Sequence, residues 1–195
     1  MVPASTTPSA RQSELLEAAY RYALEHGLAD LSLRPLAAAI GSSPRVLMFL
    51  FGNKDGLVRA LLARARADEL AFLGELTDPA APADLAAAVA QVWHWLAAPG
   101  HRPLLRLWSE AYARSLVEPD GPWSGFARAT VDDWLTLLAR FQPAGDSADA
   151  VTDRTLALAV LRGCLLDLLA TGDEPRVTAA VDRHRATLGA ADRYR

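Results

Sequence analysis

The 195-residue chain lacks most of the features on which disulfides, zinc sites and membrane spans depend. Its one cysteine, Cys164, excludes an intrachain disulfide and a cysteine-rich zinc site. No stretch of about 18 apolar residues is free of charge, so the sequence predicts no membrane-spanning helix. The first residues contain no apolar run of the kind that a secretory signal needs, and we therefore expect a cytoplasmic protein.

Signatures of catalysis are also scarce. The only lysine, Lys54, is not part of a Gly-Lys-Ser/Thr sequence, which excludes a Walker A phosphate loop. Residues 121–125 read Gly-Pro-Trp-Ser-Gly and lack the Gly-x-Ser-x-Gly order of a hydrolase elbow. The histidines are scattered, and none has the i, i+4 spacing of a helical zinc pair. We therefore expect no enzyme, no metal and no cofactor; an enzyme of the helical class that uses no metal is an alternative.

Helix-forming residues, by contrast, are abundant. Alanine, leucine and arginine dominate, 51% of the residues are hydrophobic, and no segment alternates with the period of a strand. The sequence thus predicts an all-α protein. Charge is distributed unevenly, because residues 1–66 carry eight basic and five acidic side chains, whereas the whole chain has a net charge of −3. A basic N-terminal segment on an acidic body is suited to contact a polyanion.

Capping and turn signals predict about nine helices. Ser9 with Gln12 forms a capping-box pattern, and Ser43 precedes Pro44, which is tolerated at a first helical position. The proline-rich segment at residues 77–82 predicts a break in the chain. The predicted helices lie between Ser9 and Gly27, between Ser32 and Gly41, between Ser43 and Gly52, and over residues 54–75, 83–98, 103–117, 123–141, 148–170 and 174–188.

Residues 32–51 have the layout of a helix-turn-helix motif, in which two short helices are joined by a glycine and a few turn residues. Gly41 can take a positive φ without a Cβ clash and can therefore turn the chain sharply. The small side chains of Ala37 and Ala38 allow two helices to approach closely. A shared core would come from Leu36, Ile40, Leu47 and Phe51.

Three segments of this region carry a resemblance to a known family. Residues 15–27 match its first helix, residues 31–41 match its second helix and turn, and residues 51–57 match an aromatic residue followed by a loop and Lys-Asp/Glu-x-Leu. The chain thus resembles the TetR family of transcriptional regulators over about residues 11–62. Residues 162–173 resemble the family's penultimate helix more loosely.

The resemblance implies a DNA-binding domain at residues 9–55 and a helical effector-binding and dimerisation domain at residues 56–195. Arg45 would begin the recognition helix and bind guanine O6 and N7, and Lys54 would hold a phosphate at a helix N-terminus. The implied DNA-binding residues are Arg34, Ser42, Ser43, Pro44, Arg45 and Lys54.

The chain departs from the family pattern on the recognition helix. The family usually has Tyr, an aromatic residue and His at the positions that Met48, Phe49 and Leu50 hold here. Hydroxyl and imidazole groups at these positions typically touch phosphates, so several such contacts are lost. A helical ligand-binding or interaction protein with weakened DNA binding is therefore the alternative to a regulator.

The five tryptophans all follow the break at residues 77–82. A buried indole N–H needs a partner, so a cluster of tryptophans suggests a wall that contacts a ligand, although an ordinary core is the alternative. By resemblance, this region would bind the effector, for which we expect a small, mostly apolar, ring-containing molecule. The predicted ligand-binding residues are Trp93, Trp108, Tyr112, Phe126 and Trp134, with His94 and Thr130 as polar groups.

A broad apolar face on the helix at residues 148–170 predicts a homodimer built on the last two helices, with packing inside the same subunit as the alternative. A two-fold dimer presents two recognition helices, about 34–36 Å apart, to a near-palindromic double-stranded DNA operator. We therefore expect a dimeric DNA-binding repressor. The predicted interface residues are Leu158, Leu161, Leu165, Leu168 and Leu169.

Overall fold

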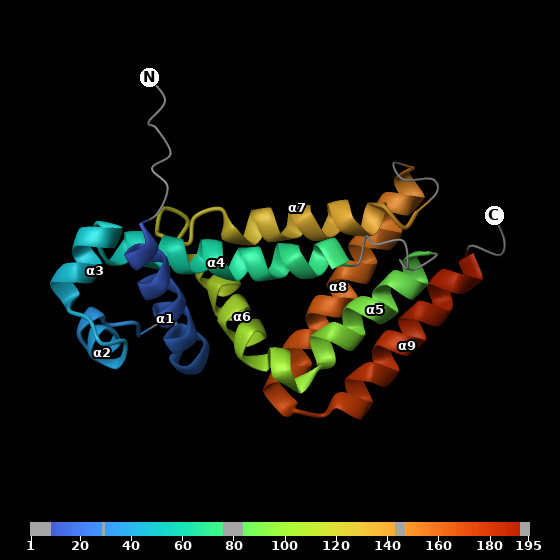
Figure 1. The fold of residues 1–195 in the computed structure, drawn as a ribbon. Helices are drawn as coiled ribbons and strands as arrows, with labels where there is room; N and C mark the ends of the chain where they lie inside the picture. Colours follow the sequence, from blue (N-terminus) through green and yellow to red (C-terminus); the bar gives the residue numbers. More distant parts are fainter. Residues whose placement is uncertain (1–8, 29, 76–83, 143–146, 192–195) are drawn as a thin grey trace, which may run out of the picture.

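The computed structural model describes residues 9–28, 30–75, 84–142 and 147–191. Within these residues it contains no strand, which confirms the predicted all-α fold, and the predicted break at residues 77–82 lies outside them. A 3-10 turn at Pro99–His101 accompanies nine α-helices in these ranges (Figure 1). They are α1 (Ala10–His26), α2 (Leu33–Ala39), α3 (Pro44–Phe51), α4 (Lys54–Glu75), α5 (Leu85–Ala97), α6 (Arg102–Val117), α7 (Phe126–Ala139), α8 (Ala148–Thr171) and α9 (Glu174–Ala191).

The helix ends follow the capping signals of the sequence closely. The Ser9 hydroxyl accepts the backbone N–H of Gln12 at 3.2 Å, and the Ser43 hydroxyl accepts that of Val46 at 3.3 Å. Gly41, between α2 and α3, has the predicted positive φ, 64°. These local interactions explain why the helix-turn-helix could be located from the sequence.

The start of α7 differs from the prediction. The helix expected from residue 123 begins at Phe126, because Gly125 adopts a left-handed conformation with φ 75° that interrupts the helical backbone. The hydroxyl of Ser115 on α6 accepts the backbone N–H of Ala127 at 3.1 Å and so satisfies a free donor in the first turn.

The helices form a small head and a larger body (Figure 1). The head consists of α1, α2, α3 and the start of α4 at one end of the molecule, and the rest of α4 leads from it along α7 into the body. In the body, α9 packs against α5 and α8, and α7 packs against α6 and α8. None of the helices in the described ranges is long and apolar enough to cross a membrane.

Two helices of the body hold the head. The hydroxyl of Tyr20 on α1 donates to Asp68 on α4 at 2.8 Å, and Arg64 on α4 binds Glu17 on α1 at 2.6 Å. At the C-terminal end of α1, the backbone N–H of Leu28 donates to the carboxylate of Glu110 on α6 at 2.9 Å. A movement of either α4 or α6 would therefore be transmitted to the head.

Candidate functional site

Three basic side chains are exposed where the helices of the head begin. Arg34 lies in the first turn of α2, Arg45 in the first turn of α3, and Lys54 at the start of α4. None of them forms an ion pair with any residue that the structure describes. Their charges are therefore available to a polyanion, and no internal contact has to break first.

The hydroxyl groups of the turn are placed differently from one another. Ser43 is half-buried and uses its oxygen to cap α3, and Pro44 follows as the first helical residue. The Ser42 oxygen is buried and has no hydrogen-bond partner among the described residues. Ser42, which we predicted to hold a phosphate, thus turns its hydroxyl away from the surface in this conformation.

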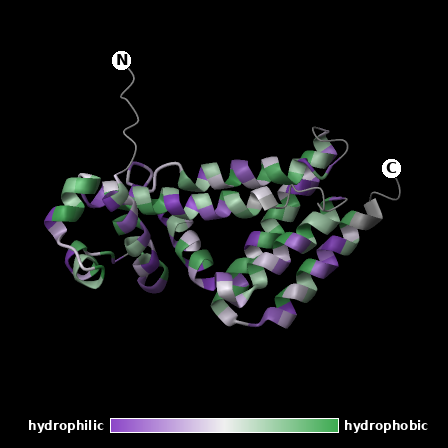
Figure 2. Cartoon of the chain, in the orientation of Figure 1, coloured by the Kyte–Doolittle hydropathy of each residue, from purple (hydrophilic) through white to green (hydrophobic). Residues whose placement is uncertain are grey.

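Helix α3 is largely apolar, as its mostly green colour in Figure 2 shows, and part of its apolar surface is exposed. Phe49 is 85% exposed and Met48 is 46% exposed, whereas Leu47 is buried between the helices of the head. Apolar side chains in a major groove contact thymine methyl groups and cannot bind phosphates. Arg45 is the one charged side chain on α3, so the exposed apolar surface of Met48 and Phe49 lies on the same helix as a single cation.

The body contains a buried carboxylate that the sequence analysis missed. Glu69 on α4 is only 4% exposed, and its two oxygens accept the indole N–H groups of Trp108 at 3.1 Å and Trp134 at 2.6 Å. Burial raises the pKa of Glu69 to about 7, although the two indole hydrogen bonds oppose this shift. Its spacing from Ala65 and Phe72 places it on the apolar face of α4, and this was the signal available in the sequence.

A hollow of about 270 Å³ opens between α6 and α8. Of the predicted ligand-binding residues it brings together Trp108 and Tyr112, which lie one turn apart on α6. Trp134 lies next to Trp108, with ring centroids 6.2 Å apart, and the two cavities that both rings line hold only about 10 Å³ each. The residues around the hollow are Trp108, Ser109, Tyr112, Ala113, Leu116, Arg162, Leu165 and Leu166.

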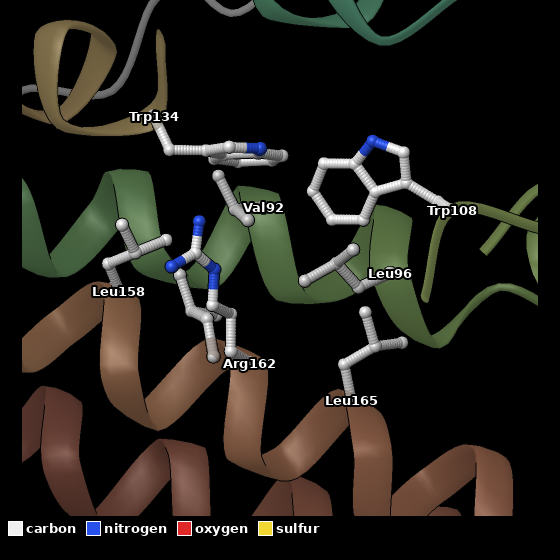
Figure 3. Close-up of a pocket in the computed structure, with 8 residues that line it drawn as sticks. Val92, Leu96, Trp108, Trp134, Leu158, Arg162 and Leu165 are labelled. Carbon is white, nitrogen blue, oxygen red and sulfur yellow. The ribbon is translucent and has the colours of Figure 1, made fainter. Parts of the chain in front are cut away.

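Arg162 on α8 contributes a positive charge to this hollow. Its Nη1 lies 3.4 Å from the Tyr112 hydroxyl, and its guanidinium carbon lies 5.0 Å from the centroid of the Tyr112 ring. Figure 3 shows the guanidinium pointing from α8 toward Trp134. Burial lowers the pKa of Arg162. The sequence analysis did not select it, although it is the only charged residue between Leu156 and Leu166.

The other predicted ligand-binding residues lie away from the hollow. The indole N–H of Trp93 donates to Thr178 on α9 at 2.9 Å, which ties α5 to α9. Phe126 is buried, and the fully buried hydroxyl of Thr130 has no partner among the described residues. His94 is exposed. The aromatic residues of the body therefore divide into core packing and one wall of the hollow.

The leucines predicted to form a dimer interface lie mostly inside the subunit. Leu158, Leu161, Leu165 and Leu168 are at most 5% exposed, and Leu169 is half-buried. They face α5, α7 and α9 of the same chain, so packing within the subunit accounts for them. The opposite, exposed face of α8 is also apolar and carries Leu156, Ala159, Gly163, Leu166 and Ala170.

Within the described ranges, no group of three His, Cys, Asp or Glu side chains is arranged to hold a metal ion. Three features of the described residues are therefore candidates for binding another molecule. They are the exposed cations at the starts of α2, α3 and α4, the hollow lined by Arg162, and the exposed apolar face of α8.

Residues 15–61 match a family model described as "Bacterial regulatory proteins, tetR family". No curated protein sequence matches the chain. Among solved structures, a transcriptional regulator from Rhodococcus sp. Rha1 aligns with a TM-score of 0.73 and 20% identity, over 91% of this chain and 95% of that chain. A TetR transcription regulator from Haloarcula marismortui aligns with a TM-score of 0.73 and 18% identity, over 92% and 97%.

A third similar structure holds a ligand. The multidrug binding protein EbrR, complexed with proflavin, aligns with a TM-score of 0.63 and 26% identity, over 89% of this chain and 99% of that chain. All three similarities extend well beyond residues 15–61 and include the helices of the body.

Proposed function

Because residues 15–61 match the TetR family model and the fold resembles that of TetR-type regulators over most of the chain, we propose that the protein is a TetR-family repressor that releases its operator when a small molecule binds the body. The observation that carries the proposal is the exposure of Arg34, Arg45 and Lys54 at three neighbouring helix starts of a helix-turn-helix. Such a protein acts by binding, without catalysis, and works in the cytoplasm where its DNA is.

In the proposed complex α3 enters the major groove with its N-terminal end toward the bases. Arg45 would donate two hydrogen bonds to a guanine, while Lys54 and Arg34 would neutralise phosphates. Phe49 and Met48 would pack on thymine methyl groups, because their exposed surfaces are apolar. The operator should accordingly combine a guanine with neighbouring thymines in each half-site.

We propose a homodimer formed by the outer face of α8 together with α9. Leu156 and Leu166 are 51% and 58% exposed, and the small residues Ala159 and Gly163 between them would allow a second helix to approach closely. A Leu166→Arg variant should sediment as a monomer, bind operator weakly and keep its helicity. A Leu70→Arg variant, at another exposed leucine, should remain dimeric.

Effector binding would be coupled to DNA binding through α6. Trp108, Ser109 and Tyr112 on this helix line the hollow, and Glu110 between them holds the backbone of Leu28 at the end of α1. EbrR, which has a similar fold, binds proflavin. A ligand that prefers one position of α6 would shift the population of head positions by its difference in affinity.

The test is selection of operator sites from random double-stranded DNA, followed by anisotropy titrations on the selected and a scrambled duplex. The proposal predicts a near-palindromic site and a dimer bound to it. If the protein recovers no preferred sequence and binds both duplexes equally at physiological salt, the repressor function is wrong.

A helical ligand-binding protein with weakened DNA binding is the second candidate. It is favoured by one observation, the exposed apolar surface of Phe49 and Met48 where phosphate-binding groups are usual. This candidate predicts that ligands bind the body with ordinary affinity, whereas selection recovers no operator. The same two measurements therefore separate the two functions.

A further inference from the structure

Arg162 is the one charged residue that lines the hollow between α6 and α8 in the described part of the chain, and its guanidinium contacts Tyr112 of the hollow while pointing toward Trp134 in the small cavity beside it (Figure 3). Its side chain is half-buried, and its Nη2 is buried without a hydrogen-bond partner among the described residues. Its Nη1 has only the 3.4 Å contact with the Tyr112 hydroxyl. A buried donor that remains unpaired costs free energy, and the cost is larger when the group is charged.

No carboxylate within the described ranges pairs with this guanidinium. The carboxylate that acts electrostatically on Arg162 is that of Glu69. Both oxygens of Glu69, however, already accept the indole N–H groups of Trp108 and Trp134. Glu69 also does not line the hollow, so a molecule in the hollow meets the positive charge of Arg162 and no compensating negative one.

The remaining wall of the hollow is apolar. Trp108 provides an aromatic surface and Leu165 an aliphatic one, whereas the exposed Leu116 and Leu166 form the rim, and Leu166 also belongs to the proposed dimer face. The hydroxyl of Ser109 is engaged with the backbone oxygen of Leu105 at 2.8 Å, so it has no proton to offer a ligand. The site thus combines one planar cationic group with an apolar enclosure of about 270 Å³, which is room for a small one- or two-ring molecule.

We propose that the effector is an aromatic carboxylate, with its carboxylate bound by Arg162 and its rings against Trp108 and the leucines. This inference rests on the proposed function only in calling the ligand an effector. A planar carboxylate matches the paired N–H donors of a guanidinium, and such charge-assisted hydrogen bonds are the strong ones. It adds a carboxylate to the expected mostly apolar, ring-containing ligand, because Arg162 lines the hollow.

The test uses three probes of one shape and different charge: 2-naphthoate, 2-naphthamide and 2-naphthylmethylammonium. Calorimetry and tryptophan fluorescence measure binding to the full chain in the absence of DNA. The wild-type protein should bind 2-naphthoate at least about tenfold more tightly than the amide, and the ammonium most weakly. Equal affinity for naphthoate and amide, or preference for the ammonium, would overturn the proposal.

Substitutions of Arg162 test whether this residue causes the preference for naphthoate over the amide. Arg162→Met should bring naphthoate affinity down to that of the amide, and Arg162→Lys, which keeps the charge without the paired donors, should retain part of the preference. Arg106→Met, at an exposed arginine of α6 outside the hollow, is the matched control and should bind as wild type. Circular dichroism checks folding, and if Arg162→Met does not fold, the Arg162→Lys result decides.

Operator titrations then separate this inference from the proposed function. Naphthoate that binds through Arg162 but leaves operator affinity unchanged would contradict the effector role and leave the site assignment intact. Operator binding together with no preference among the three probes would contradict the carboxylate assignment and leave the repressor intact.

Discussion

The head and the body place their charged groups in opposite ways. In the head, Arg34, Arg45 and Lys54 lie at the surface and pair with none of the described residues. In the body, Glu69 is buried against two indoles, and Arg162 is half-buried at a hollow. The attraction between exposed cations and a polyanion acts at long range and is weakened by salt. Buried charges, by contrast, interact mainly with groups a few ångströms away. The comparison suggests that the head supplies affinity for DNA and the body supplies chemical discrimination.

The largest expected effect is a change in the free energy of unfolding with pH, caused by Glu69 in the body. Burial raises the pKa of Glu69 to about 7 in the folded chain from its ordinary value of 4.5, so the folded state holds the proton more tightly than the unfolded state. Its contribution to stability is therefore complete below pH 4.5 and is lost as pH rises to 7, by on the order of 3 kcal/mol. Urea denaturation across this range measures the free energy of unfolding.

Glu69→Gln is the comparison for that experiment, because glutamine keeps an acceptor for one indole and cannot ionise. The difference in unfolding free energy between wild type and variant should change between pH 4.5 and 7 and be constant above. Arg66, Asp133 and Arg162 also act on Glu69 or feel its charge, so only this difference isolates Glu69. A difference that stays constant from pH 4.5 to 7 would contradict the assignment.

The next effect distinguishes two cations of the head. Arg45→Ala should cost about 1–3 kcal/mol at one base pair of the operator and relax the preference at that position. Lys54→Ala should weaken operator and scrambled DNA alike and lower the salt dependence by about one charge. Titrations on both duplexes at two salt concentrations make the measurement. If Arg45→Ala lost equal affinity on both duplexes, Arg45 would be a phosphate contact.

A smaller effect is expected where head and body meet. Glu110→Ala leaves the Leu28 N–H without its acceptor, and we expect a loss of about 1 kcal/mol in stability. The variant should bind an effector normally in the absence of DNA, yet the effector should shift its operator affinity less than in wild type. Glu118→Ala, which removes a half-buried partner of Arg114 just after the C-terminal end of α6, is the control. Full retention of the effector response by Glu110→Ala would show that the coupling takes another path.

The smallest effect concerns the apolar surface of α3. Met48→Tyr places a hydroxyl on an exposed position of the recognition helix, where it can reach a phosphate, and should raise affinity by about 0.5–1 kcal/mol. The gain should be similar on operator and scrambled DNA, because phosphates carry no sequence. Leu70→Tyr, on α4 in the body, should leave the affinity for both operator and scrambled DNA unchanged. An unchanged affinity would mean that position 48 lies outside reach of the backbone.

Local signals in the sequence were enough to locate the helices and the helix-turn-helix. Caps such as Ser9 and Ser43 and a turn glycine such as Gly41 act through their immediate neighbours along the chain. The exposure of Arg45 follows from its place at the start of α3, next to the cap, and therefore also from the local sequence. The sequence did not predict where α7 starts, because Gly125 lies inside a segment whose composition otherwise favours a helix.

Only the tertiary structure decided which residues of the body meet. Leu165 and Leu166 are adjacent and chemically identical, yet one is buried in the subunit and the other is 58% exposed. Since α8 packs against α5, α7 and α9 and is apolar on its outer face as well, its periodicity cannot distinguish the core face from the surface. Glu69, Trp108 and Trp134 come together from α4, α6 and α7. Contacts between residues so distant in the sequence depend on how the helices pack, which no local pattern records.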